Sequence, residues 1–185
     1  PNYFEVTNLR LIGFSISGND GNAAAMIADQ DIANVKIYNV SLEGTSSIAA
    51  TSYGYAGGLI SYAGEKLEIS NCSVSGASIS SNGSGRHAGG LVGNFNGAVL
   101  SLSNCNASAY VGANGDSACA GGLIGSLTCS NTNDSAINKC FFSQSSTTID
   151  GYSVHTGARA GQAGGLIGNM SSSIAINSSY STGSV

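Results

Sequence analysis

Charged residues and proline are scarce in this chain of 185 residues. Asp, Glu, Lys and Arg make up 9% of it, there is no tryptophan, and Pro1 is the single proline. The net charge of −4, without any basic cluster, argues against nucleic acid and anionic membranes as partners. No apolar run approaches the roughly 18 residues of a membrane span, so we expect no membrane insertion. We also expect the chain to be a piece of a longer repetitive protein.

Glycine is abundant, with 27 residues, and one pattern that contains it recurs. Ala-Gly-Gly-Leu followed by Ile or Val occurs at 56–60, 88–92, 120–124 and 163–167. The first glycine of the pattern recurs after 32, 32 and 43 residues, at Gly57, Gly89, Gly121 and Gly164. A pattern repeated at a nearly fixed spacing is typical of solenoid proteins, in which stacked units bury a common core.

Short stretches of alternating apolar residues follow each glycine pattern and predict half-buried strands. They include Ile-Ser-Asn-Cys at 69–72, Leu-Ser-Asn-Cys at 102–105 and Ile-Asn-Lys-Cys at 137–140. No window has the 3.6-residue periodicity of a helix. We therefore predict one all-β domain over 1–185, a right-handed parallel β-helix of about five coils with three short strands in each.

The glycine pattern itself is predicted to turn a corner of each coil. Two glycines allow the backbone to turn sharply or to approach its neighbour closely. The leucines that follow should then stack as one internal row, formed by Leu59, Leu91, Leu123 and Leu166. The unit with 43-residue spacing carries extra residues, and we expect a protruding loop insertion at 143–162.

The five cysteines fall into two groups. Cys72, Cys105 and Cys140 occupy the same repeat position, which predicts a buried row of free thiols that behave as small apolar groups. Metal binding and disulfides between coils are less favoured alternatives for this row, because no histidine or CxxC spacing accompanies it. Cys119 and Cys129 flank the third glycine pattern, and a local disulfide between them stays open.

Candidate chemistry is sparse, and we predict no catalytic residues, no cofactor and no metal. Asp29 and Asp31, with Asp20 nearby, form the one local group of acids that could hold Ca²⁺ or act as acid and base. Acids do not recur at the aligned positions of later coils. His87 precedes a glycine pattern where other coils have Tyr, Cys or Gln, so it is interpreted as a stacking or surface residue.

The insertion at 143–162 is the first candidate for recognition of a ligand, because binding residues concentrate on loops. It contains His155 and Arg159, and the exposed tyrosines considered with it are Tyr152 and Tyr180. The alternative is a surface excursion without a function.

The repeats resemble a known family. Gly164 to Gly168, followed by Ile-Asn-Ser-Ser-Tyr-Ser-Thr-Gly at 176–183, is similar to the GLUG motif. The resemblance covers roughly 56–185 and is weaker at 57–61, where Ser61 replaces the last glycine. GLUG repeats occur in bacterial surface and secreted proteins, including adhesin-like proteins and non-catalytic regions of IgA-specific metallopeptidases. The resemblance implies a parallel β-helix at the cell surface, with no catalytic residues.

We therefore expect a structural or adhesive segment of an extracellular bacterial surface protein, such as a stalk, adhesin or fibre, that is not an enzyme. The alternative is a module that binds a carbohydrate or host protein through surface loops, and a carbohydrate-active β-helix enzyme ranks third. An open solenoid end exposes unpaired strands, so head-to-tail self-association is also expected unless flanking chain covers the ends.

Overall fold

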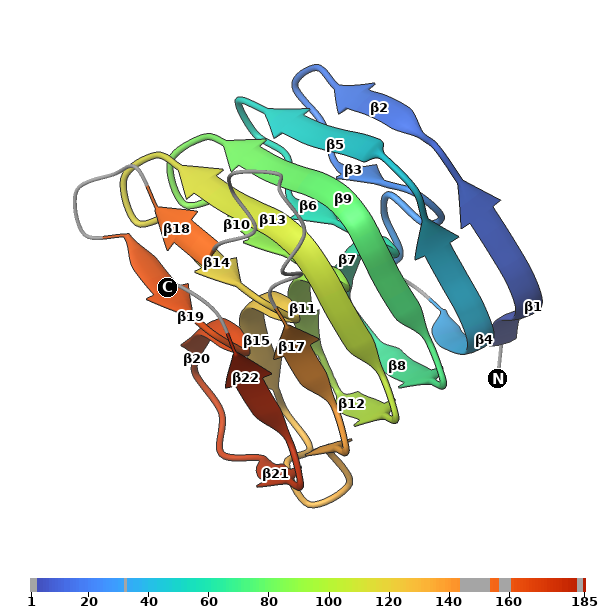
Figure 1. The fold of residues 1–185 in the computed structure, drawn as a ribbon. Coiled ribbons are helices and arrows are strands. Elements are labelled where there is room, and N and C mark those ends of the chain that lie inside the picture. The colour runs from blue at the N-terminus through green and yellow to red at the C-terminus, as the bar shows by residue number, and fades with distance from the viewer. Residues whose placement is uncertain (1–2, 32, 144–153, 157–160, 183–184) are drawn as a thin grey trace.

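The computed structural model describes residues 3–31, 33–143, 154–156, 161–182 and 185, and every element in these ranges is a β-strand. The strands form a parallel β-helix of about four turns, slightly fewer than expected (Figure 1). The coils that begin at Ala56 and His87 have four strands each instead of the predicted three, because the glycine pattern is divided between two strands. The second coil shows this division, with β6 (Ala56–Gly57) and β7 (Ile60–Ala63) on either side of Gly58 and Leu59.

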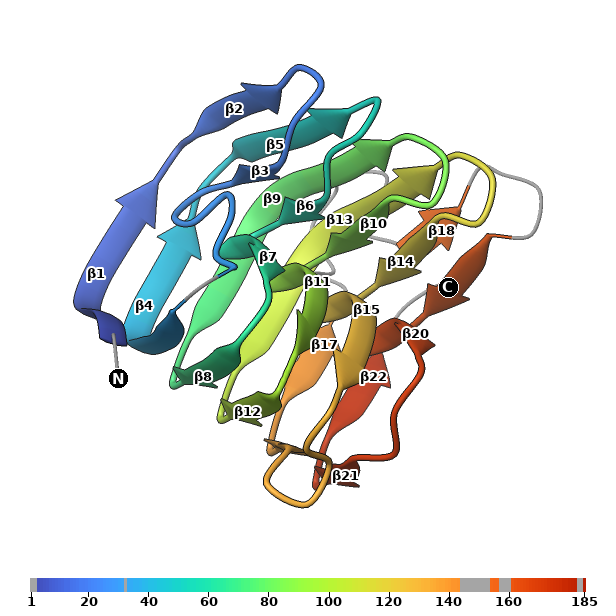
Figure 2. The same ribbon diagram turned by 180° about the vertical axis from the view of Figure 1, so that it is seen from behind.

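Three sheets surround the core, and their strand pairs are all parallel. Sheet A has thirteen strands: β1 (Tyr3–Ile12), β2 (Ser15–Gly18), β4 (Asn34–Glu43), β5 (Ser46–Thr51), β8 (Lys66–Ser70), β9 (Ser73–Asn82), β12 (Val99–Ser103), β13 (Asn106–Asn114), β16 (Ala136–Asn138), β17 (Phe141–Ser143), β18 (Val154–Thr156), β21 (Ala175–Asn177) and β22 (Tyr180–Thr182). Sheet B has β3 (Ala23–Ala24), β6, β10 (His87–Gly89), β14 (Cys119–Gly121) and β19 (Gln162–Gly164). Sheet C has β7, β11 (Val92–Gly97), β15 (Ile124–Cys129) and β20 (Ile167–Met170), and Figure 2 shows it from behind.

Asparagine marks one corner of the coil, inside sheet A. The residue at this corner has a left-handed backbone in six successive passes of the chain: Asn8, Asn39, Asn71, Asn104, Lys139 and Ser178, with φ between 49° and 55°. Asparagine tolerates this conformation better than other side chains that have a Cβ. The flanking pairs, such as Ser70 with Ser103, hold these corners in register from coil to coil.

The predicted leucine row exists. Leu59, Leu91 and Leu123 are fully buried, and Leu166 in the last coil is half-buried. Further rows of aliphatic side chains fill the core in the same way, and Phe95 and Phe142 are its largest buried residues. Coil stacking therefore buries faces that no single short strand could bury alone.

The glycines of the repeat are required by close approach and not by a left-handed backbone. A Cβ on Gly89 would overlap the carbonyl oxygen of Val92 in the same coil, and one on Gly90 would overlap the carbonyl of Gly122 in the next coil. A Cβ on Gly93 would lie 2.6 Å from the carbonyl oxygen of Ala56 in the preceding coil. The pattern thus allows a close approach of backbone, both between sheets B and C within a coil and between adjacent coils, that a larger residue would prevent.

Apolar side chains of the first and last coils remain exposed. In the first coil, Phe4 is 47% and Ile12 is 58% exposed, and in the last coil Ile176 is 40% and Tyr180 is 54% exposed. Val35 and Ile137, which align with Phe4 and Ile176 in the adjacent coils, are buried. The described residues include no helix long and apolar enough to cross a membrane.

Candidate functional site

Aromatic side chains gather on the outer faces of sheets B and C, where the two sheets approach each other. Tyr55 precedes the buried Ala56 of β6, and Tyr62 precedes the buried Ala63 of β7, so both rings lie on outer faces. Their ring centroids are 5.9 Å apart with an interplanar angle of 18°. His87, beside Tyr55 in the next coil, stacks on the same ring at 5.4 Å. With Arg86, whose guanidinium lies 5.1 Å from the centroid of Tyr55, these residues form what we call the Tyr55 cluster.

Polar groups hold the Tyr55 cluster in place. Arg86 donates a hydrogen bond from Nη1 to the hydroxyl of Tyr55 at 2.9 Å, and the Tyr55 amide donates to Oδ1 of Asn22, also at 2.9 Å. Burial raises the pKa of Tyr62, and the negative charges of Asp31 and Asp29 raise it further. The acids predicted as a local group therefore lie beside a tyrosine ring.

His87 is held uncharged at neutral pH. Burial, and to a smaller extent the charge of Arg86, lowers the pKa of His87 to about 4. Its Nδ1 atom and Nε of Arg86 are buried without a hydrogen-bond partner, and they are the two such side-chain atoms among the residues that the structure describes. His87 was interpreted as a stacking or surface residue, and its stacking on Tyr55 confirms that interpretation.

The carboxylates do not converge on a common point in the described ranges. Asp29 accepts a hydrogen bond from Nδ2 of Asn22 at 3.0 Å, and Asp31 lies over Gly64, which aligns with it in the next coil. Glu68 lies 2.6 Å from Lys66 and 3.5 Å from Lys36, so it is an ion-pair partner on sheet A. No three His, Cys, Asp or Glu side chains gather as metal ligands in the part of the chain described.

The predicted thiol row exists, and its geometry is more specific than apolar packing. Cys72, Cys105 and Cys140 are buried and free. Each thiol donates to the carbonyl oxygen two residues earlier, across the left-handed corner, at 3.1 to 3.2 Å. The hydroxyl of Ser179, next in the row, makes the same bond at 2.9 Å.

Neighbouring thiols and burial set the acidity of this row. Contacts with Cys140 and Cys72, followed by burial, raise the pKa of Cys105.

The local disulfide considered between Cys119 and Cys129 is not formed, because both residues are free. Cys119 lies on the outer face beside Gln162, whose Oε1 is 3.6 Å from its sulfur, whereas Cys129 ends β15. Burial raises the pKa of both thiols.

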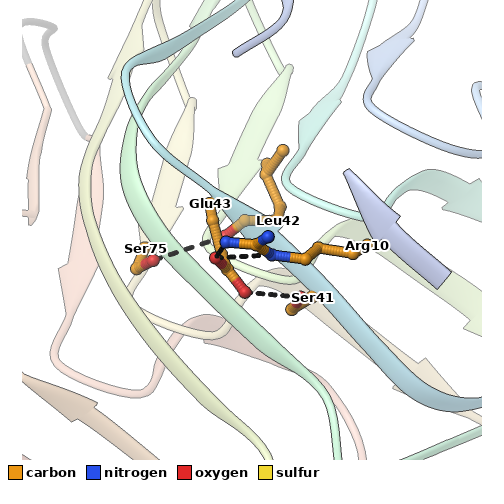
Figure 3. A network of polar contacts seen from close by, with 5 residues as sticks. All are labelled: Arg10, Ser41, Leu42, Glu43 and Ser75. Atoms are coloured by element: carbon orange, nitrogen blue, oxygen red, sulfur yellow. Dashed lines mark hydrogen bonds and ion pairs between the residues drawn. The ribbon is translucent and has the colours of Figure 1, made fainter. Parts of the chain in front are cut away.

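An ion pair between Arg10 and Glu43 joins the first two coils on the outer face of sheet A. Arg10 contacts Glu43 through Nε and Nη2 at 2.9 and 2.6 Å, and Ser41 donates to the other carboxylate oxygen of Glu43 at 2.9 Å (Figure 3). The hydrogen bond with Arg10 is the main cause that lowers the pKa of Glu43. Both side chains are open to solvent, so we interpret this pair as part of the surface and not as a site.

The loop predicted as the first candidate for recognition lies largely outside the described residues. This applies to Tyr152 and Arg159. Of the insertion at 143–162 the structure describes residues 143, 161 and 162 and the backbone of β18, in which Val154 pairs with Val111 and His155 with Gly112. Tyr180 is described, and its ring stacks on Phe141 with centroids 5.2 Å apart.

Comparisons with family models, with curated proteins and with solved structures found no match to this chain.

The sequence interpretation missed the Tyr55 cluster. The signal was present, because Tyr55 and His87 precede successive glycine patterns and must be neighbours once the repeats are stacked. Tyr62 lies two residues after the glycine pattern at 56–60, and Asp29 occupies the same position in the preceding coil. The repeat pattern did not reveal that the row of Tyr55 on sheet B and the row of Tyr62 on sheet C come into contact.

Proposed function

We propose that the chain is a structural and adhesive segment, without catalysis, of an extracellular bacterial surface protein such as a stalk, adhesin or fibre. The observation that carries this proposal is that the core rows and backbone ladder of sheet A continue from coil to coil and end on exposed apolar residues in the first and last coils, such as Phe4 and Ile176. The resemblance of the repeats to the GLUG motif supports the same kind of protein and a location at the cell surface.

A spacer role follows from the direction of the hydrogen bonds. Backbone amides donate along the solenoid axis to both neighbouring coils, as in Leu59 to Leu91 of the next coil at 3.0 Å and Ser61 to Ile27 of the preceding coil at 3.0 Å. Bending the solenoid would lengthen these hydrogen bonds and, at the same time, separate the stacked side chains of the core rows. Such a stack resists bending and proteolysis better than a chain of separate small domains.

The two end coils are complementary to one another. Placing the left-handed corner at Asn8 of one copy over that at Ser178 of another aligns Val6 with Ile176, and both belong to core rows. The same register puts Arg10 over the exposed ring of Tyr180, where a cation–π contact contributes about 0.5–1 kcal/mol. Ala28 aligns with Ser61 and then with Gly93, Gly125 and Gly168, so it stands where the last coil has glycine, and the junction should form mainly through sheets A and B.

We infer that copies of the chain stack head to tail through these ends when nothing else covers them. Light scattering after size exclusion, over a range of concentrations, should show masses that grow in steps of one chain. Ile176→Lys should reduce this growth at least tenfold in concentration, because it puts a charge into a core row at the junction. Tyr53→Lys, at a lateral position that is 70% exposed, is the matched control and should associate normally. A single monomeric mass at every concentration would refute self-association.

A further inference from the structure

The Tyr55 cluster differs in residue type from the rest of its two rows. In the row of Tyr55 and His87, the neighbouring coils contribute Asn22, Cys119 and Gln162, and in the row of Tyr62 they contribute Asp29, Asn94, Ser126 and Asn169. Amides and small side chains are therefore sufficient for stacking at these positions. Two tyrosines, an arginine and a histidine in two adjacent coils need another explanation, in a chain with so few charged residues.

The cluster also carries a cost in stability. The Nε atom of Arg86 and Nδ1 of His87 are buried without a hydrogen-bond partner, and such a group destabilises the folded state because it loses its hydrogen bonds to water. Both side chains contact the ring of Tyr55. Residues that break the local rules of stability tend to lie at functional sites. A row selected for stacking alone would have no reason to retain this arrangement.

The geometry of the cluster suits a ligand with an apolar face and hydroxyl groups. Tyr55 and Tyr62 come from different sheets of one coil and are half-buried, so part of each ring faces solvent at the angle between the sheets. Carboxylates lie next to Tyr62 in the preceding coil, since Gln30 pairs with Ala63 and thereby aligns Asp29 with Tyr62 and Asp31 with Gly64. Rings provide a surface for C–H groups, and carboxylates accept hydrogen bonds from hydroxyls.

The charges at the cluster argue against two other classes of ligand. Asp29 and Asp31 would repel a polyanion, and the guanidinium of Arg86 already occupies the cation–π position on Tyr55. A cationic ligand would have to displace Arg86 or bind beside it. An uncharged ligand meets neither obstacle.

We propose that the Tyr55 cluster, together with Asp29 and Asp31, is a binding site for a neutral saccharide. The sugar ring packs on the exposed part of Tyr62, which Tyr55 supports by stacking, and its hydroxyl groups donate to Asp29 and Asp31. This inference goes beyond the structural role and does not depend on it, because a monomeric chain would contain the same site.

The test is an array of immobilised neutral oligosaccharides built from hexoses and N-acetylhexosamines, with sialylated and sulfated glycans alongside. We expect binding to at least one neutral structure, with Kd below 1 mM when the same oligosaccharide is titrated in solution. Tyr62→Ala should weaken this binding at least tenfold, and Tyr62→Phe, which keeps the ring, should weaken it only a few-fold.

Tyr180→Ala is the matched control, because it removes another stacked outer ring that lies outside the cluster. It should bind like the wild type, and circular dichroism should show that all three variants keep the strand content. The proposal is overturned if no neutral glycan binds, if only acidic glycans bind, or if both Tyr62 variants bind like the wild type.

Discussion

The thiol of Cys105 lies 3.1 Å from the carbonyl oxygen of Ser103, across the left-handed corner at Asn104. The same relationship recurs one coil earlier and one coil later, and Ser179 reproduces it with a hydroxyl. This position thus requires a side chain that is small enough to be buried and that carries a hydrogen-bond donor on its γ atom. This finding adds a hydrogen bond to the predicted buried row of free thiols.

Substitutions at Cys105 should separate the two contributions. Cys105→Ser keeps a donor for the carbonyl oxygen of Ser103, and we expect the free energy of unfolding to fall by less than about 1 kcal/mol. Cys105→Ala loses the donor and leaves a small cavity, which should cost about 1–3 kcal/mol. Urea denaturation measures both values. A serine variant less stable than the alanine variant would show that apolar packing alone decides this position.

The glycines of the repeat should tolerate no side chain. Gly89→Ala would place a Cβ against the backbone of Val92 and 2.6 Å from the Gly125 amide, so we expect a loss above about 4 kcal/mol or failure to fold. Gly21→Ala is the matched control, since its Cβ would meet only the carbonyl of Asn19 at 4.0 Å. Thermal denaturation should place this control within about 0.5 kcal/mol of the wild type. Equal stability of the two variants would contradict the close approach of sheets B and C.

The corner at Lys139 offers a stabilising change. Lysine has the left-handed backbone there with φ of 52°, where Asn71 and Asn104 stand in earlier coils. Because asparagine adopts this conformation at lower cost, Lys139→Asn should raise the free energy of unfolding by about 0.5–1 kcal/mol. The opposite effect is expected for Asn104→Ala, which removes an asparagine from the same corner and should lower the free energy of unfolding by about 1 kcal/mol. A destabilised Lys139→Asn would indicate that the lysine makes a compensating contact.

The low pKa of His87 predicts a pH dependence of stability. Between about 4 and 6.5 the unfolded chain binds a proton at His87 that the folded chain does not, so stability should fall as the pH drops through this window. His87→Gln, which introduces the residue found at position 162 of the same row, should remove that part of the dependence. The comparison is made by urea denaturation at pH 7 and pH 5, because the lowered pKa values of Glu43 and Glu68 act at lower pH. The prediction fails if both proteins lose equal stability.

The repeat pattern was sufficient to predict the parallel β-helix and its leucine and cysteine rows, because period and apolar alternation fix which residues stack. It did not predict the fourth strand of each coil, since the close approach at Gly89 and Gly93 depends on backbone atoms from adjacent coils. The role of Asn71 and Asn104 was missed for a similar reason, because a left-handed corner has no hydrophobic signature. The Tyr55 cluster required both the stacking of coils and the contact between sheets B and C.

We propose that the core rows and hydrogen-bond ladders of this solenoid continue from one copy of the chain to the next, so that stacked copies form a rod. Electron microscopy of the isolated chain at increasing concentration tests it most directly. The account predicts unbranched rods that lengthen along the solenoid axis, with a spacing of about 4.8 Å between strands running through the junctions. Discrete monomers at all concentrations, or copies joined side by side, would contradict it.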